Sequence, residues 1–148
     1  MNKKHKRYSI AAIIAITALA LTACDDKPDP DPDPAKNDTI TLTGDLNKTI
    51  TIDYSGSGLT QAQADNNVTP KLEGAFNVFA GLLTGNPARN AFDVMVNKSG
   101  FKIVIIPGNS GCARVSDTMT LGADFLLTND MQNIGNSIQS ALMNGIFV

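Results

Sequence analysis

This 148-residue chain has no Trp and a single His. That histidine, His5, lies in a basic N-terminal stretch that we expect to be absent from the mature protein. An imidazole is the usual base beside a catalytic serine or cysteine, and it is a frequent zinc ligand. The mature protein is therefore not expected to use Ser-His-Asp or Cys-His catalysis or to hold a histidine zinc site.

Cysteine is also scarce, because Cys24 and Cys112 are the only two in the chain. No Cys-x-x-Cys pair is present, which excludes the redox chemistry of such motifs. If Cys24 is modified, as argued below, Cys112 has no partner for an intramolecular disulfide. We expect Cys112 to be a buried packing residue, since unpaired cysteines are among the most buried side chains.

Basic side chains are few outside the first seven positions. Residues 38–148 contain nine acidic and six basic side chains, and the whole chain has a net charge of −2. A surface with excess negative charge repels phosphate groups. We therefore predict that nucleic acids are not partners of this protein.

Acidic side chains with the spacing of a metal site are missing as well. Glu73 is the sole glutamate, and Asp117, Asp124 and Asp130 could meet only if the loops between them converged. The chain has neither a His-Glu-x-x-His helix nor a Gly-x-x-x-x-Gly-Lys phosphate loop. The sequence therefore predicts no metal site and no cofactor.

The first 24 residues, in contrast, have the organisation of a secretory signal. A basic start is followed by an apolar run over 10–23, which is shorter than the ~20 residues needed to cross a bilayer. The run ends in Leu21-Thr22-Ala23-Cys24, which resembles the lipobox of bacterial lipoproteins. The resemblance implies that residues 1–23 are removed and that Cys24 is acylated on its sulfur and usually on its new amino group. A plain signal peptide or an uncleaved anchor is the alternative.

Acylation of Cys24 would attach the protein to a bacterial membrane, since each buried methylene contributes ~0.8 kcal/mol. Asp25 and Asp26 follow directly. In enteric bacteria an Asp in this place resembles the signal that keeps a lipoprotein in the inner membrane, whereas in Bacteroidetes-like bacteria an acidic tract resembles a surface-export signal. We expect a domain in the periplasm at the inner membrane, with the outer membrane or the cell surface as alternatives.

Residues 24–37 read as a tether, because Pro and Asp alternate over 28–34. Proline fixes φ and removes hydrogen-bond donors, and the like charges repel, so the segment is expected to be extended. The folded domain is predicted to be 38–148. Its composition differs from that of the tether, since it carries all of the phenylalanines.

Two strands and two helices stand out in the domain. Thr alternates with Ile, Leu or Tyr over 39–43 and again over 49–54, which predicts a hairpin with one apolar face. Thr69 and Pro70 are placed to begin a helix that ends before Gly85, and a short helix is also considered over 61–66. A last helix is predicted from about residue 129 to the residue before Gly145.

The remaining strands are predicted from alternation and from apolar runs. We expect strands over 92–96 and 101–106, the latter central in its sheet, and one or two more within 113–120 and 123–128. The order β-β-α-β-β-β-α predicts an α+β fold, a small sandwich of a mostly antiparallel sheet with two main helices on one face.

Leu72, Phe76, Phe79 and Leu83 recur at helical spacing within the first of these helices. A stripe of this kind is typical of the face that a surface helix turns toward the core. The alternative is that the aromatic side chains line a groove for a lipid or another ligand.

Gly108-Asn109-Ser110-Gly111-Cys112 is the one stretch that suggests a nucleophile. It superficially resembles the surroundings of a hydrolase serine, but Cys112 stands where the second elbow glycine would be. Without histidine, only Lys98 or Lys102 could serve as the base for Ser110 or Cys112. A glycine-rich loop between strands is the simpler interpretation, because turns use the same residues.

These features predict a membrane-anchored lipoprotein whose domain is a non-enzymatic binding or inhibitor module with a protein partner in the cell envelope. One alternative is an envelope hydrolase or transferase that uses Ser110 or Cys112, which requires Lys98 or Lys102 beside them. Another is a structural subunit that assembles through an unpaired edge strand, for which the Thr-rich hairpin is the candidate.

Overall fold

The structure is a computed structural model and describes residues 31–144. The described residues all belong to one compact unit. Cys24, Asp25 and Asp26 lie outside the described residues. Within 31–144, no helix combines the length and the hydrophobicity needed to cross a membrane.

A five-stranded mixed sheet forms one layer of the unit, with the strand order β1-β2-β3-β5-β4. The outer pairs β1-β2 and β4-β5 are antiparallel, whereas β2-β3 and β3-β5 are parallel. The predicted mixed α and β composition is therefore confirmed, whereas the prediction of a mostly antiparallel sheet holds only for the two outer pairs. The strands are β1 (Asp38–Leu42), β2 (Lys48–Asp53), β3 (Lys102–Ile106), β4 (Ala113–Val115) and β5 (Thr118–Gly122).

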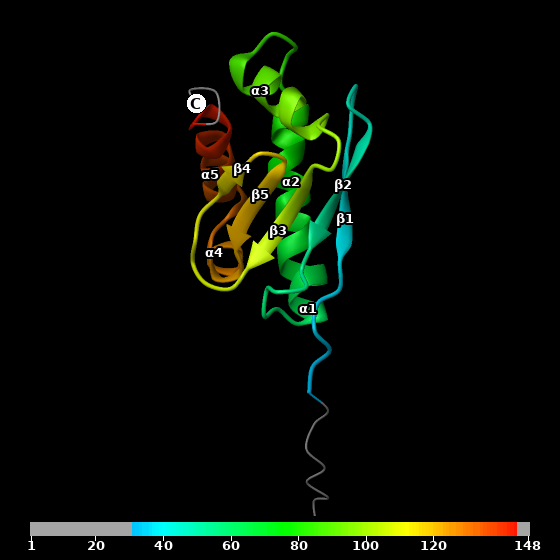
Figure 1. Cartoon of the computed structure of the whole chain (residues 1–148), viewed down its shortest axis with the longest axis vertical. Coiled ribbons are helices and arrows are strands. Elements are labelled where there is room, and N and C mark those ends of the chain that lie inside the picture. Colours follow the sequence, from blue (N-terminus) through cyan, green and yellow to red (C-terminus); the bar gives the residue numbers. More distant parts are fainter. Residues whose placement is uncertain (1–30, 145–148) are drawn as a thin grey trace, which may run out of the picture. The chain divides into compact units, whose positions relative to one another are not determined.

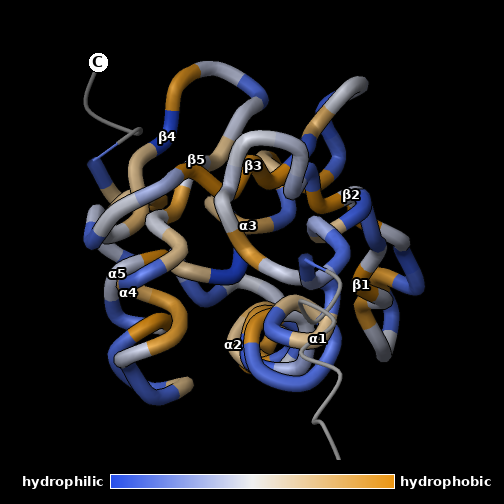
Figure 2. The backbone as a smooth tube through the Cα atoms, turned by 90° about the horizontal axis from the view of Figure 1, so that it is seen from below, coloured by the Kyte–Doolittle hydropathy of each residue, from blue (hydrophilic) through white to orange (hydrophobic). Residues whose placement is uncertain are grey.

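Helices form the second layer, and the views along and across it show α2 and α5 on the same side of the sheet (Figures 1 and 2). The helical segments are α1 (Gln61–Gln63), a π-helical turn η1 (Ala64–Val68), α2 (Thr69–Ala80), α3 (Pro87–Val96), α4 (Ala123–Thr128) and α5 (Met131–Asn144). The core lies between the layers. Ile40, Ile52 and Ile103 are buried in it, whereas Thr39, Thr51 and other alternate strand residues face solvent.

The predicted hairpin is confirmed as β1-β2, and the strand predicted over 101–106 is the central strand β3. The predicted α2 is also confirmed, but Thr69 does not cap it. A capping box of Thr60 and Gln63 begins the helix at α1, and η1 continues it into α2. The Thr69 hydroxyl is instead 2.9 Å from the hydroxyl of Tyr54 and donates to Asp38 at 3.1 Å.

The strand predicted over 92–96 is wrong, because these residues form the second half of α3. The Asn86 side chain accepts a hydrogen bond from the Ala88 N–H at 2.9 Å, and Pro87 takes the first helical position. Phe92 and Val96 are buried, which fits strand alternation as well as a helix. Val94 faces solvent while Met95 is buried, and that pattern fits only the helix.

The strand predicted over 123–128 is also wrong, because α4 follows β5 directly. The Lys71 ammonium donates to the carbonyl oxygens of Leu126 at 2.8 Å, Leu127 at 3.2 Å and Asn129 at 2.8 Å. These oxygens converge on one cation because they lie at the end of a helix, where the carbonyls lack helical partners. Lys71 is distant in sequence, so a local pattern could not reveal this contact.

The folded unit begins before the predicted boundary at residue 38. The Ala35 N–H donates to the Leu59 carbonyl at 2.9 Å, and the Gln61 N–H donates to the Asp33 carbonyl at 2.8 Å. Ala35 is buried against the core. The last residues of the predicted tether 24–37 are therefore part of the fold, because their backbone pairs with the segment before α1.

Candidate functional site

The Ser110 loop is held against the end of β5 and the start of α4. The Gly122 N–H donates to the Ser110 carbonyl at 2.7 Å, and the Asp124 N–H donates to the Gly108 carbonyl at 3.0 Å. A Cβ atom on Gly122 would collide with the Gly108 carbonyl oxygen, so only glycine allows this approach. The loop is thus a packed connection between β3 and β4, as the simpler interpretation predicted.

The structure does not bring the predicted lysine bases to this loop. Lys102 is the first residue of β3, and the loop leaves its other end after Ile106. Four residues of strand separate the two ends by roughly 13 Å. Lys98 precedes the strand at the same end as Lys102, whose ammonium lies 3.8 Å from the Asp53 carboxylate. Neither lysine is therefore placed to activate Ser110 or Cys112.

Cys112 is half-buried and packs against the core just before β4. Burial raises the pKa of its thiol to about 12. Its backbone N–H donates to the Ser137 hydroxyl oxygen on α5 at 2.7 Å. At neutral pH the thiol is protonated, and only a thiolate is a good nucleophile. The structure therefore fits the predicted packing role, although Cys112 is less deeply buried than we expected.

The aspartates considered for a metal do not form a site. Asp117 accepts a hydrogen bond from the neighbouring Ser116 hydroxyl, which lowers the pKa of its carboxyl. Asp124 stands in the first turn of α4, and Asp130 accepts the Asn133 N–H at 2.8 Å. Over residues 31–144, no group of three or more His, Cys, Asp or Glu side chains is arranged to hold a metal ion.

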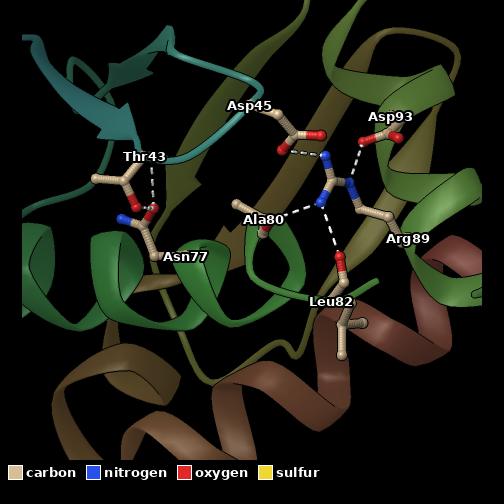
Figure 3. Close-up of polar contacts among 7 residues, drawn as sticks. All are labelled: Thr43, Asp45, Asn77, Ala80, Leu82, Arg89 and Asp93. Carbon is tan, nitrogen blue, oxygen red and sulfur yellow. Dashed lines mark hydrogen bonds and ion pairs between the residues drawn. The ribbon is translucent and has the colours of Figure 1, made fainter. Parts of the chain in front are cut away.

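A buried cation joins three elements at the end of α2 (Figure 3). Arg89 is 3% exposed, and its guanidinium forms ion pairs of 2.6 Å with Asp45 of the β1-β2 turn and with Asp93 of α3. It also donates to the carbonyls of Ala80 at 2.6 Å and Leu82 at 2.9 Å. The hydrogen bond from Arg89 holds the pKa of Asp45 below its usual value. Because all three guanidinium nitrogens donate hydrogen bonds, this Arg89 cluster is a structural clamp.

The outer edge of β1 is closed by side chains of α2. Asn77 accepts the Thr43 N–H at 2.9 Å and donates to the Thr41 carbonyl at 3.1 Å, and Figure 3 shows its contact with Thr43. Glu73 accepts the Thr41 N–H at 3.2 Å. An exposed edge strand invites pairing with another chain only if its backbone groups are free. Three backbone groups on the outer edge of the Thr-rich hairpin are therefore already paired with α2.

A groove with a volume of about 410 Å³ lies between α2, α3 and α5. One wall is α2, where Phe79 is buried below the exposed side chain of Val78. The other wall is α5. The lining residues are Ala75, Val78, Phe79, Leu82, Asn86, Ala88, Met131, Gln132, Gly135, Asn136 and Gln139. The volume lies within the ~300–1,000 Å³ range of ligand sites.

The aromatic stripe of α2 belongs mainly to the core, as the helical spacing predicted. Phe76 and Phe79 pack on Phe92 of α3, with ring centroids 5.7 and 5.5 Å apart. Leu72 is fully buried, whereas Leu83 lies beyond the helix and is 84% exposed. The stripe is therefore mainly core, and Phe79 also lines the groove.

Two glycines differ in how the structure uses them. A Cβ atom on Gly74 of α2 would run into the Sδ atom of Met131, so Gly74 allows the close approach of α2 and α5. A Cβ atom on Gly135 of α5 would meet nothing within 4 Å. Glycine inside a helix costs roughly 0.5–1 kcal/mol relative to alanine. No contact among the described residues requires Gly135, and its effect is to leave the groove open.

Sequence reasoning missed the α5 wall of the groove. Gln132, Asn136 and Gln139 follow the spacing of a single helical face, and a glycine stands between them. That signal is visible in the sequence, but a polar helical face normally means only that it is solvated. The facing wall of α2 became apparent only when the packing of the two helices was known.

Comparison of the chain with protein-family models, with curated proteins and with solved structures found no match.

Proposed function

We propose that this chain is a bacterial lipoprotein of the cell envelope whose folded unit is a non-enzymatic binding or inhibitor module. Its binding site is the groove between α2, α3 and α5. The observation that carries the proposal is the apolar groove itself, with the exposed side chains of Val78 and Met131 at its walls. Apolar surface that a domain leaves open in a concave site is typical of a binding function.

The anchor in this proposal is Cys24, acylated after removal of residues 1–23. Asp25 and Asp26 act as the sorting signal, and the inner membrane is the proposed location. Support comes from the basic start, the apolar run and the Leu-Thr-Ala-Cys ending of the leader. Intact-mass analysis of protein extracted from membranes should show acylated Cys24 as the N-terminus, and any other N-terminus would contradict the anchor.

The competing enzymatic interpretation has less support. A Ser110 or Cys112 nucleophile needs a nearby base, and both predicted lysines lie at the far end of β3. A thiol with a pKa of about 12 is also a poor nucleophile at neutral pH.

The binding role can be tested by photo-crosslinking in the envelope of the producing cell. A photoreactive residue at Val78 would stand in the groove, and one at Val94 gives a matched control on α3. Both valines are similarly exposed, at 59% and 63%, but only Val78 lines the groove. We expect a discrete adduct from position 78 and none from position 94. Equal labelling from both positions would contradict a binding role for the groove.

A further inference from the structure

We infer that the groove binds an extended, uncharged peptide segment with apolar side chains, and this inference rests on the proposed binding function. The partner is identified by two properties of the walls. The α2 side is apolar, whereas the α5 side offers a row of carboxamides. The lining includes no Asp, Glu, Lys, Arg or His.

The carboxamide row consists of Gln132, Asn136 and Gln139. All three are exposed, and their side chains form no hydrogen bond with another described residue. A carboxamide carries both a donor and an acceptor, as does a backbone peptide group. An extended peptide has free N–H and C=O groups along its length, so it can pair with the row while its side chains fill the groove.

The length of the carboxamide row fits a short segment of extended peptide. Seven residues separate Gln132 from Gln139, which is about 10 Å along a helix that rises 1.5 Å per residue. An extended chain advances roughly 3.3 Å per residue. The row therefore matches about three residues of peptide, of which those on one side can point into the apolar groove.

The uncharged lining selects against charged segments. A charged side chain placed against Ala75, Phe79 or Ala88 would lose its hydration and find no opposite charge in the lining. Other occupants fit less well. A helix has its backbone groups paired internally, and an acyl chain has no polar groups, so either would leave the carboxamides unpaired.

Gly135 is the second, independent support. It lies on α5 within the carboxamide row, and an added Cβ atom there would meet no atom within 4 Å. We therefore expect a bulky residue at this position to occupy part of the groove. The glycine thus keeps clear the space that the peptide side chains would occupy.

The test is selection from a display library of short peptides, using the protein extracted from its own membranes and reconstituted in nanodiscs. Gly135→Ala and Gly135→Leu serve as a matched pair, since both replace the helical glycine but only leucine fills the groove. We expect enrichment of peptides that carry apolar residues at alternate positions and lack charged residues. Enrichment should persist with Gly135→Ala and fall at least about tenfold with Gly135→Leu.

A second arm tests the carboxamide row. N-methylation of single backbone amides in an enriched peptide should weaken binding by about tenfold at one or two positions, because it removes a donor. Equal binding of all methylated peptides would overturn the backbone pairing and favour a helix or an acyl chain. Enrichment of charged peptides, no enrichment, or equal binding to Gly135→Leu would also overturn the inference. If crosslinking from Val78 succeeds while no peptide is selected, the binding function stands and only the ligand class fails.

Discussion

The Arg89 cluster and the groove lie at neighbouring parts of α2 and α3, yet the polar groups of the cluster are hydrogen-bonded whereas those of the groove are not. In the cluster a buried guanidinium is bonded to two carboxylates and two carbonyls. In the groove three exposed carboxamides of α5 have no hydrogen-bond partner among residues 31–144. The comparison teaches that a buried charge with complete pairing supports the fold, whereas unpaired polar groups beside apolar surface are available to a ligand.

Removing the cation should have the largest effect on stability. Arg89→Met leaves the Ala80 and Leu82 carbonyls without their donor, so the free energy of unfolding should fall by about 3 kcal/mol. Denaturant unfolding measures this loss. Arg114→Met is the control, because within residues 31–144 Arg114 makes a single hydrogen bond, of 3.2 Å, to the carbonyl of the neighbouring Ser116. A similar loss in both variants would show that the Arg89 cluster is not a clamp.

Opening the β1 edge should have an intermediate effect. Asn77→Ala removes the partner of the Thr41 carbonyl and the Thr43 N–H, which should cost about 1.5 kcal/mol. The freed edge should also promote self-association, which sedimentation can detect. Asn66→Ala is the control, since the Asn66 side chain donates to the Ala62 carbonyl four residues earlier and to no other described residue. If Asn77→Ala stays as stable and as monomeric as Asn66→Ala, the edge is not protected by Asn77.

Substitution of Gly135 should have a smaller effect, and of the opposite sign. Gly135→Ala should raise the free energy of unfolding by roughly 0.5–1 kcal/mol, because alanine favours the helix and meets no neighbour. Gly85→Ala is expected to lose stability, because Gly85 has a φ of +95° that alanine disfavours. A loss of stability in Gly135→Ala would mean that Gly135 is required for packing and does not simply keep the groove open.

The smallest expected effect is that of acid, which should lower the stability contributed by Asp45 but leave the ligand affinity of the groove unchanged. The folded-state pKa of Asp45 is lowered by Arg89, so its contribution to stability is present above the unfolded pKa of ~3.9 and is lost as the pH falls through the folded value. The free energy of unfolding in urea should be lower for Asp45→Asn than for wild type at pH 7. The two values should become equal in strong acid. Ligand affinity of the groove should stay constant from pH 5 to 8, since no ionisable side chain lines it. A steep change there would implicate a charged group.

The sequence was sufficient for elements whose pattern is local. Thr-rich alternation predicted β1-β2, and the helical stripe predicted α2. It failed at α3, where Phe92, Val94 and Val96 fit both periods and the capping by Asn86 was overlooked. It failed at α4, where a contact with Lys71 stabilises the helix end across more than 50 residues.

The candidate site was harder to predict for the same reason. Ser110 and Cys112 were singled out because they resemble known motifs, but the distance to Lys98 and Lys102 depends on the direction of β3. The groove arises only when α2 packs beside α5. No local sequence pattern predicts that packing, although Gly135, which lies at the groove, can be recognised in the sequence as a glycine inside a predicted helix.

The most direct test of the central claim is the yield of the crosslinked adduct from position 78 in two backgrounds, Gly135→Ala and Gly135→Leu. Both variants should be at least as stable as wild type, so a difference between them reports on the groove alone. The account predicts a strong adduct with alanine and a loss of at least about tenfold with leucine, as expected when the apolar contacts and hydrogen bonds of the ligand are lost. Equal adduct yields in the two backgrounds would contradict the claim that this groove is the binding site.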